Sequence, residues 1–261
     1  MMQQSWSAFL GTPGSAHGVQ IYTDDDELAD SVVGYAAAGF EREEPAILVA
    51  TPAHLDVFRE RLDALGWQSA SLEQRGLLVS ADAEATLDAL LVDGSVSPIS
   101  FEQVIGGLID RTAGERGGQT RVFGEMVDVL CQRGQLDSAM ALEDLWTTAA
   151  QHRRFSLLCG YCIDVFDRGA QARTLPSVCA HHSHILPAQK YARFARSVDC
   201  ALDEVLGSRE AGRIYMLLGR QMHEERVPAA QLILMWVSRN MPILAERILE
   251  SARTHYLASA A

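Results

Sequence analysis

The chain has 261 residues, 48% of them hydrophobic, and a formal net charge of −12. This length suits one large domain with a smaller one, and the apolar fraction is enough for a buried core. The acidic excess argues against nucleic-acid or anionic-membrane binding. No apolar run reaches the ~20 residues of a membrane span, and no signal peptide is recognisable. Five scattered cysteines suit reduced thiols, so we expect a cytoplasmic protein.

The first part of the chain has the layout of a nucleotide-binding core. Residues 1–16 form a loose leader, and the pattern after them predicts a strand over 19–23, an amphipathic helix over 24–42 and a buried strand over 46–51. Asp24 and Glu27 resemble a capping box at the start of this helix.

Four consecutive carboxylates, Asp24 to Glu27, occupy the first strand–helix junction. A nucleotide-binding protein carries a glycine-rich phosphate loop and a lysine there. The single lysine of the chain is Lys190, and no glycine-rich loop precedes it. Four carboxylates would repel a triphosphate, so we expect an architecture that does not bind nucleotide in the usual way.

Strands continue to alternate with helices up to about residue 186. The further elements are predicted as a helix over 53–65, a strand over 76–80, helices over 83–93 and 101–111, a strand over 120–123, helices over 126–132 and 136–151, and a strand over 155–161. This alternation indicates an α/β fold with a doubly wound, mostly parallel sheet. Residues 187–261 show only helical periodicity, and breaks at Gly207, Pro228 and Pro242 divide them into four helices. We therefore predict a domain over 17–186 and a small all-α domain over 187–261.

Ligands bind open α/β sheets outside the carboxyl ends of the strands. That rule places Tyr22, Thr51, Asp82, Glu125 and Tyr161 near one edge. Glu125 follows a glycine at a strand end, where a carboxylate can face a pocket. It can equally serve as a charge at the start of the next helix, and both interpretations stay open.

Other candidate residues have simpler interpretations. Glu143 and Trp146, three apart on one helix, suit a surface carboxylate beside a packed indole, unless the family resemblance given below holds. Cys159 and Cys162 fall in a strand, where residues three apart face opposite sides and do not form a metal knuckle. Buried cysteine is usually an inert small hydrophobe.

A cysteine–histidine cluster follows the last predicted strand. Cys179, His182 and His184 offer the thiolate and imidazole ligands that suit zinc, iron or copper. In the alternative, His182 or His184 closes a ligand pocket or ties the linker to the core. We expect no metal and no cofactor, and keep this cluster as the metal-binding alternative.

Five ordered motifs resemble one known family. They are His17-Gly18-Val19-Gln20-Ile21-Tyr22, Arg121-Val122-Phe123-Gly124-Glu125-Met126-Val127, Leu142-Glu143-Asp144-Leu145-Trp146, Leu158-Cys159-Gly160-Tyr161 and Cys179-Ala180-His181-His182-Ser183-His184. Together they resemble the MEDS family, the sensory domain of the dichloromethane-responsive repressor and of many methanogen and bacterial signalling proteins. The resemblance covers about residues 15–188 and implies sensing of a small molecule, proposed for the family to be a simple hydrocarbon derivative. Residues 45–83 also resemble KaiC-type domains, which implies a RecA-like core that has lost its ATP site.

These observations predict a non-catalytic signalling protein. Its sensory domain over 17–186 would bind a small molecule, and its C-terminal helices would form a homodimer, the commonest oligomer, or contact a signalling partner. The candidate ligand-binding residues are Tyr22, Thr51, Glu125, Cys159, Tyr161 and His182. The alternative is an enzyme, either a degenerate KaiC-like NTPase or a hydrolase that uses the Cys159 thiol.

Overall fold

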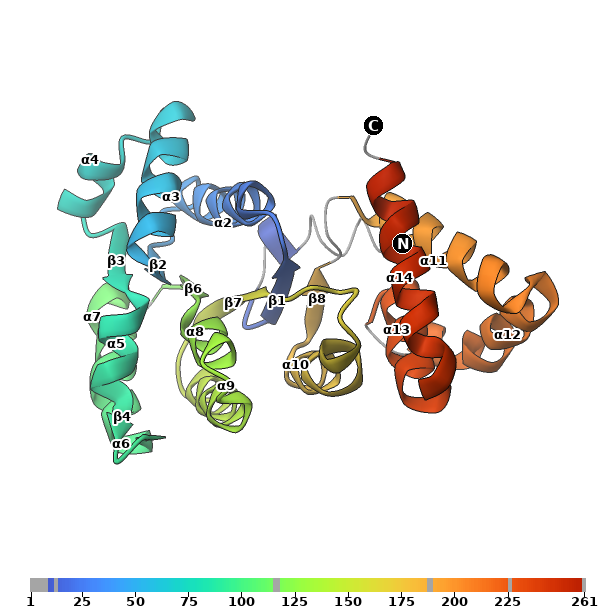
Figure 1. Ribbon diagram of the computed structural model, residues 1–261. Helices are drawn as coiled ribbons and strands as arrows, with labels where there is room; N and C mark the ends of the chain where they lie inside the picture. Colours follow the sequence, from blue (N-terminus) through green and yellow to red (C-terminus); the bar gives the residue numbers. More distant parts are fainter. Residues whose placement is uncertain (1–8, 12–13, 115–117, 187–189, 225–226, 260–261) are drawn as a thin grey trace. The chain divides into compact units, whose positions relative to one another are not determined.

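The computed structural model describes residues 9–11, 14–114, 118–186, 190–224 and 227–259 (Figure 1). The chain divides into two compact units, Met1–Cys162 and Ile163–Ala261. Within the described residues, no helix combines the length and the apolar character that a bilayer-spanning segment requires.

A parallel sheet forms the centre of the first unit. Its strands lie in the order β3-β2-β6-β7-β1, and every neighbouring pair is parallel. The bounds are β1 His17–Tyr22, β2 Ala46–Ala50, β3 Leu78–Asp82, β6 Thr120–Gly124 and β7 Phe155–Cys162. Because the strands are parallel, all their carboxyl ends lie along one edge of the sheet. The candidate ligand-binding residues at strand ends were expected along this edge.

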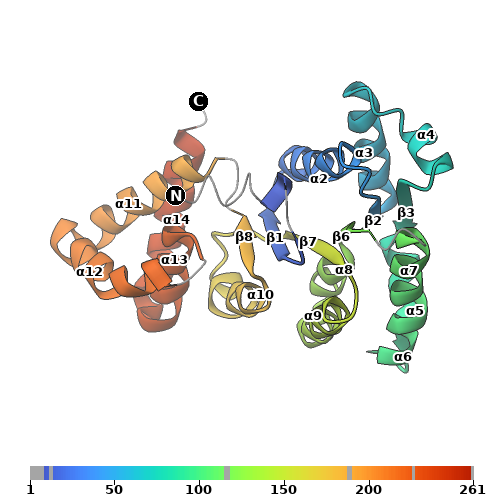
Figure 2. The same cartoon turned by 180° about the vertical axis from the view of Figure 1, so that it is seen from behind.

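Helices pack on both faces of this sheet, so the predicted doubly wound fold is confirmed. Helices α2 (Asp25–Phe40) and α3 (Pro52–Ala64) cover one face, while α5 (Ala83–Leu90), α8 (Met126–Gln132) and α9 (Leu136–Ala150) cover the other (Figures 1 and 2). Phe58 of α3 meets Phe123 edge-on, with ring centroids 5.6 Å apart. Trp146 of α9 packs against Phe155 at 5.9 Å on the opposite face.

Capping residues fix where the helices at the carboxyl edge begin. The Asp24 carboxylate accepts a hydrogen bond from the Asp26 N–H at 3.0 Å, as expected for a helix cap. Asp82 caps α5 in the same way, through the N–H groups of Glu84 and Ala85. Pro52 occupies the first turn of α3, where its missing N–H is not needed.

The short elements were harder to predict than the long ones. The sequence pattern missed helix α4 (Ser69–Gln74) and a small hairpin of β4 (Leu91–Val92) and β5 (Ser95–Val96). The helix expected over 101–111 is instead a succession of α6 (Pro98–Phe101), the π-helix η1 (Glu102–Gly106) and α7 (Gly107–Ala113). Elements this short contain too few apolar residues to establish a period.

The second unit is mainly helical. It comprises η2 (Ala170–Thr174), α10 (Leu175–His181), the short strand β8 (His184–Leu186), α11 (Tyr191–Leu206), α12 (Ser208–Glu224), α13 (Ala229–Asn240) and α14 (Pro242–Ala258). The four predicted C-terminal helices are confirmed, and Gly207, Pro228 and Pro242 lie at their junctions. Their apolar faces share one core that includes Val198, Leu218 and Ile248. The predicted boundary at 186–187 stays a prediction, because residues 187–189 lie outside those described.

Candidate functional site

Glu125 collects three hydrogen bonds at the carboxyl edge of the sheet. It follows β6, and its own N–H donates to the carbonyl of Val49 at 2.9 Å. Its Oε2 accepts from the backbone N–H of Thr51 at 2.8 Å, and its Oε1 accepts from the Tyr22 hydroxyl at 3.1 Å. The Nδ1 atom of His54 lies 2.5 Å from the same Oε1. Strands β1, β2 and β6 and helix α3 thus meet at one carboxylate, which we call the Glu125 cluster (Tyr22, Thr51, His54 and Glu125).

Hydrogen bonding, burial and neighbouring charges shift the pKa values of residues in and beside the Glu125 cluster. The hydrogen bond to Glu125 raises the pKa of His54, and this outweighs the opposing effect of partial burial. Burial and the Glu125 charge raise the pKa of the Tyr22 hydroxyl, which therefore stays protonated and donates. Burial raises the pKa of nearby Asp128 to about 6, although its Oδ1 accepts from the Cys162 N–H at 2.9 Å.

The surroundings of the cluster are acidic and aromatic. His54 Nε2 lies 3.6 Å from the exposed Asp25 carboxylate at the start of α2. The ring of His54 approaches Tyr22 at 6.2 Å and Phe58 at 5.9 Å between centroids. Only two residues, Thr23 and Asp24, separate β1 from α2, so this junction has no length for a phosphate-binding loop. The arrangement therefore suits a neutral or cationic group rather than a phosphate.

A second carboxylate, Glu143, collects side chains on the face of the sheet that α9 covers. The Tyr161 hydroxyl donates to its Oε1 at 2.6 Å. The Nε2 atom of His17 lies 3.2 Å from its Oε2, and the Cys159 Sγ lies 3.8 Å from the same atom. These four residues are called the Glu143 cluster. Tyr161 and Cys159, which we expected to share a ligand site with Glu125, thus make their contacts with a different carboxylate.

Two sequence-based interpretations are tested by the Glu143 cluster. The surface location expected for Glu143 is wrong, because its side chain is fully buried. The opposite orientation of Cys159 and Cys162 is confirmed, since the first is buried and the second exposed. Burial and the charge of Glu143 raise the pKa of the Cys159 thiol well above its usual range, which disfavours the thiolate that a hydrolase would need.

Comparison with known protein families gives a match over residues 16–182, to the MEthanogen/methylotroph, DcmR Sensory domain, called MEDS. The match covers more than half of the chain. The chain belongs to the MEDS family. A comparison with curated proteins finds no match. The family assignment establishes a sensory domain, and this is not a known catalytic family.

Both clusters of the MEDS domain contain a histidine that the sequence interpretation overlooked. His54 lies in the first turn of α3, three residues after Thr51, so its position at the carboxyl edge was available from the predicted helix start. His17 opens β1, and the strand register places it beside Leu157, two residues before Cys159. Histidine was considered only in the 179–184 segment, where it is concentrated in the sequence.

The histidines of that segment lie in the second unit and make local contacts. His182 is buried at the end of α10, and its Nδ1 lies 2.7 Å from the Val178 carbonyl oxygen. The Nδ1 atom of His184 lies 2.9 Å from the Ser183 hydroxyl. Cys179 is buried within α10. The roles considered for these residues, metal ligands or pocket closure, stay predictions.

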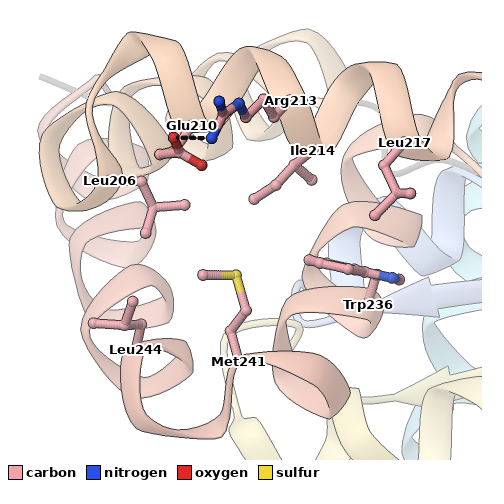
Figure 3. A pocket seen from close by; sticks show the side chains of 8 residues that line it. All are labelled: Leu206, Glu210, Arg213, Ile214, Leu217, Trp236, Met241 and Leu244. Atoms are coloured by element: carbon pink, nitrogen blue, oxygen red, sulfur yellow. Dashed lines mark hydrogen bonds and ion pairs between the residues drawn. The ribbon is translucent and has the colours of Figure 1, made fainter.

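An apolar cavity of about 430 Å³ lies among helices α11 to α14 of the second unit. Figure 3 shows Leu217, Trp236 and Met241 directed into it. Glu210 and Arg213 form an ion pair of 2.6 Å on its α12 side. This cavity falls outside the residues that match the MEDS family, which end at 182.

Proposed function

We propose that this chain is a signalling protein whose MEDS domain binds a small, weakly polar molecule at the Glu125 cluster. A simple hydrocarbon derivative fits best, in keeping with the family resemblance. The observation that carries the proposal is the convergence of Tyr22, Thr51 and His54 on one buried carboxylate at the carboxyl edge of a parallel sheet. Ligands of open α/β sheets bind at this edge.

The hydrogen bonds of the cluster provide a means of responding to a ligand. Donors within the protein fill the hydrogen-bonding positions of the Glu125 carboxylate. His54 lies between this carboxylate and the exposed carboxylate of Asp25. A small molecule with one hydroxyl or polarised C–H group can take the place of one of these donors, while its apolar part contacts the rings of Tyr22 and Phe58. Such an exchange alters contacts between α3 and the strands, and a ligand shifts a conformational equilibrium through differences of this kind.

A substitution at Glu125 tests the site. Glu125→Gln keeps the size of the side chain and one acceptor oxygen, but it removes the charge and puts an amide donor in place of the second oxygen. The matched control is Glu60→Gln, which makes the same charge change at an exposed position of α3. We expect dichloromethane or methanol, in a concentration series, to raise the melting temperature of the wild type and the control by about 5–10 °C at 100 times the dissociation constant.

The Glu125→Gln variant should show no ligand-induced shift and should melt within a few degrees of the unliganded wild type. An equal ligand-induced shift in this variant would remove Glu125 from the site. A variant that melts far below the wild type without ligand would show that Glu125 is a structural helix-terminal charge instead.

We further propose that the C-terminal helices carry the response by forming a homodimer. Large apolar side chains are exposed on them: Met216 on α12 is 84% exposed, and Ile243 on α14 is 90% exposed. Light scattering of the full chain should give a dimer, and the Ile243→Asp and Met216→Asp variants should give a monomer with an unchanged circular dichroism spectrum. A wild-type monomer would contradict this part of the proposal.

A further inference from the structure

The Glu143 cluster brings together three kinds of metal-binding atom. The Nε2 atom of His17 lies 3.3 Å from the Sγ of Cys159 and 3.2 Å from the Oε2 of Glu143, and Sγ lies 3.8 Å from Oε2. The three residues come from β1, β7 and α9, which belong to the first unit. The packing of α9 on the sheet therefore fixes their spacing.

These separations match those around a tetrahedral zinc ion. Zinc binds imidazole nitrogen at about 2.0–2.1 Å, carboxylate oxygen at about 2.0–2.2 Å and thiolate sulfur at about 2.3 Å. With tetrahedral angles, such bonds hold the ligand atoms roughly 3.4–3.6 Å apart. Each of the three observed distances differs from this range by about 0.2 Å or less. A single ion at their centre therefore needs little movement of the side chains.

The burial of the cluster favours a cation. Glu143 and Cys159 are fully buried, so an ionised carboxylate there has lost its hydration. Buried charges in proteins are paired or coordinate metals. A divalent ion neutralises one carboxylate and one thiolate together, and a neutral imidazole completes the set without adding charge. His17 remains 13% exposed and provides the side from which an ion enters.

Tyr161 fixes the orientation of the carboxylate. Its hydroxyl donates to Oε1 of Glu143 at 2.6 Å, whereas His17 and Cys159 lie against Oε2. One oxygen is therefore held by the protein and the other is presented to the ion. Hydrogen bonds of this kind orient the ligands of metal sites.

We propose that His17 Nε2, Glu143 Oε2 and Cys159 Sγ bind a zinc(II) ion in the MEDS domain. Binding replaces the proton of the Cys159 thiol, which leaves to solvent, and the ion does not change its oxidation state. This site is distinct from the Glu125 cluster, and neither proposal depends on the other.

Calorimetric titration of the full-length, chelator-treated protein with zinc chloride tests this proposal. The wild type should bind one ion at this site. The Cys159→Ser variant should lose that ion, while the matched control Cys162→Ser, three residues along the same strand and exposed, should keep it. The Tyr161→Phe variant should bind zinc roughly 10- to 100-fold more weakly, because the carboxylate loses its orienting donor.

Cobalt(II) gives a second, spectroscopic readout of thiolate binding, which the wild-type protein already provides. The wild-type protein with cobalt chloride should show the absorption band of a thiolate-to-cobalt charge transfer, and Cys162→Ser should show the same band. The proposal is overturned if the wild type takes up no zinc, or if zinc uptake and the cobalt band persist unchanged in Cys159→Ser. It is equally overturned if Cys179→Ser removes the ion while Cys159→Ser retains it.

Discussion

Two buried carboxylates in the first unit make similar contacts but differ in one neighbour. Glu125 and Glu143 each accept a hydrogen bond from a tyrosine, and each lies beside a histidine nitrogen. The third neighbour differs: it is the backbone N–H of Thr51 for Glu125 and the thiol of Cys159 for Glu143. A carboxylate among oxygen and nitrogen donors suits exchange with a small polar group, whereas a thiol beside imidazole and carboxylate suits a transition metal.

The surroundings of the two carboxylates strengthen this contrast. Glu125 lies at the end of a strand, close to Asp128 and to the exposed Asp25 through His54. Glu143 lies in the middle of α9 and faces the interior of the sheet. The first is linked through His54 to an exposed side chain, and the second is enclosed by the core of the unit.

The largest effect is expected from removing the enclosed carboxylate. Glu143→Ala leaves a cavity and deprives the buried Tyr161 hydroxyl of its acceptor. The free energy of unfolding in urea, measured without metal, should fall by about 2–4 kcal/mol. The neighbouring exposed residue is the control, and Asp144→Ala should change the value by no more than about 0.5 kcal/mol. Similar small losses in both variants would show that the Glu143 cluster is not part of the stable core.

A smaller effect is expected from pH at the Glu125 side. The pKa of Asp128 is raised to about 6 by burial, so the folded state holds this proton more tightly than the unfolded state does. The stabilisation from this proton is complete below pH ~4 and is lost as the pH rises through about 6. Asp128→Asn keeps an acceptor for the Cys162 N–H and Gln132 but does not titrate.

Urea unfolding of both proteins from pH 4 to 7 measures this difference. The stability of the wild type should fall relative to the Asn variant by about 1–3 kcal/mol over that range. Parallel stability curves would show that Asp128 titrates at the same pH in the folded and the unfolded state.

The fold and three of the four residues of the Glu125 cluster were accessible from the sequence, and His54 was not. The long strands and helices could be predicted because local features of the sequence determine them. These features are apolar runs such as Ala46–Ala50, and the glycine or proline residues at the ends of elements. Glu125 was predicted at the carboxyl edge because it directly follows the strand-ending Gly124. The positions of Tyr22 and Thr51 followed from the same rule, since parallel strands end on one side.

The Glu143 cluster could not be assembled in this way. A carboxylate within a helix is usually exposed, and the burial of Glu143 depends on His17 and Tyr161, which reach it only through the packing of α9 on the sheet. One local signal was present: Glu143 lies three residues before the buried Trp146, on the same side of the helix. The pairing of strands β1 and β7, which brings His17 beside Cys159, is a long-range contact that one sequence does not specify.

The position of a bound ligand shows directly whether the Glu125 cluster is the binding site. Dibromomethane is a close analogue of dichloromethane, and its bromine atoms give an anomalous signal in a crystal of the full-length protein. Ligand binding at the Glu125 cluster predicts a bromine peak in contact with this cluster, beside the rings of Tyr22 and His54. A peak confined to the apolar cavity lined by Trp236 and Met241, with none at Glu125, would contradict it and would place ligand binding in the C-terminal helices.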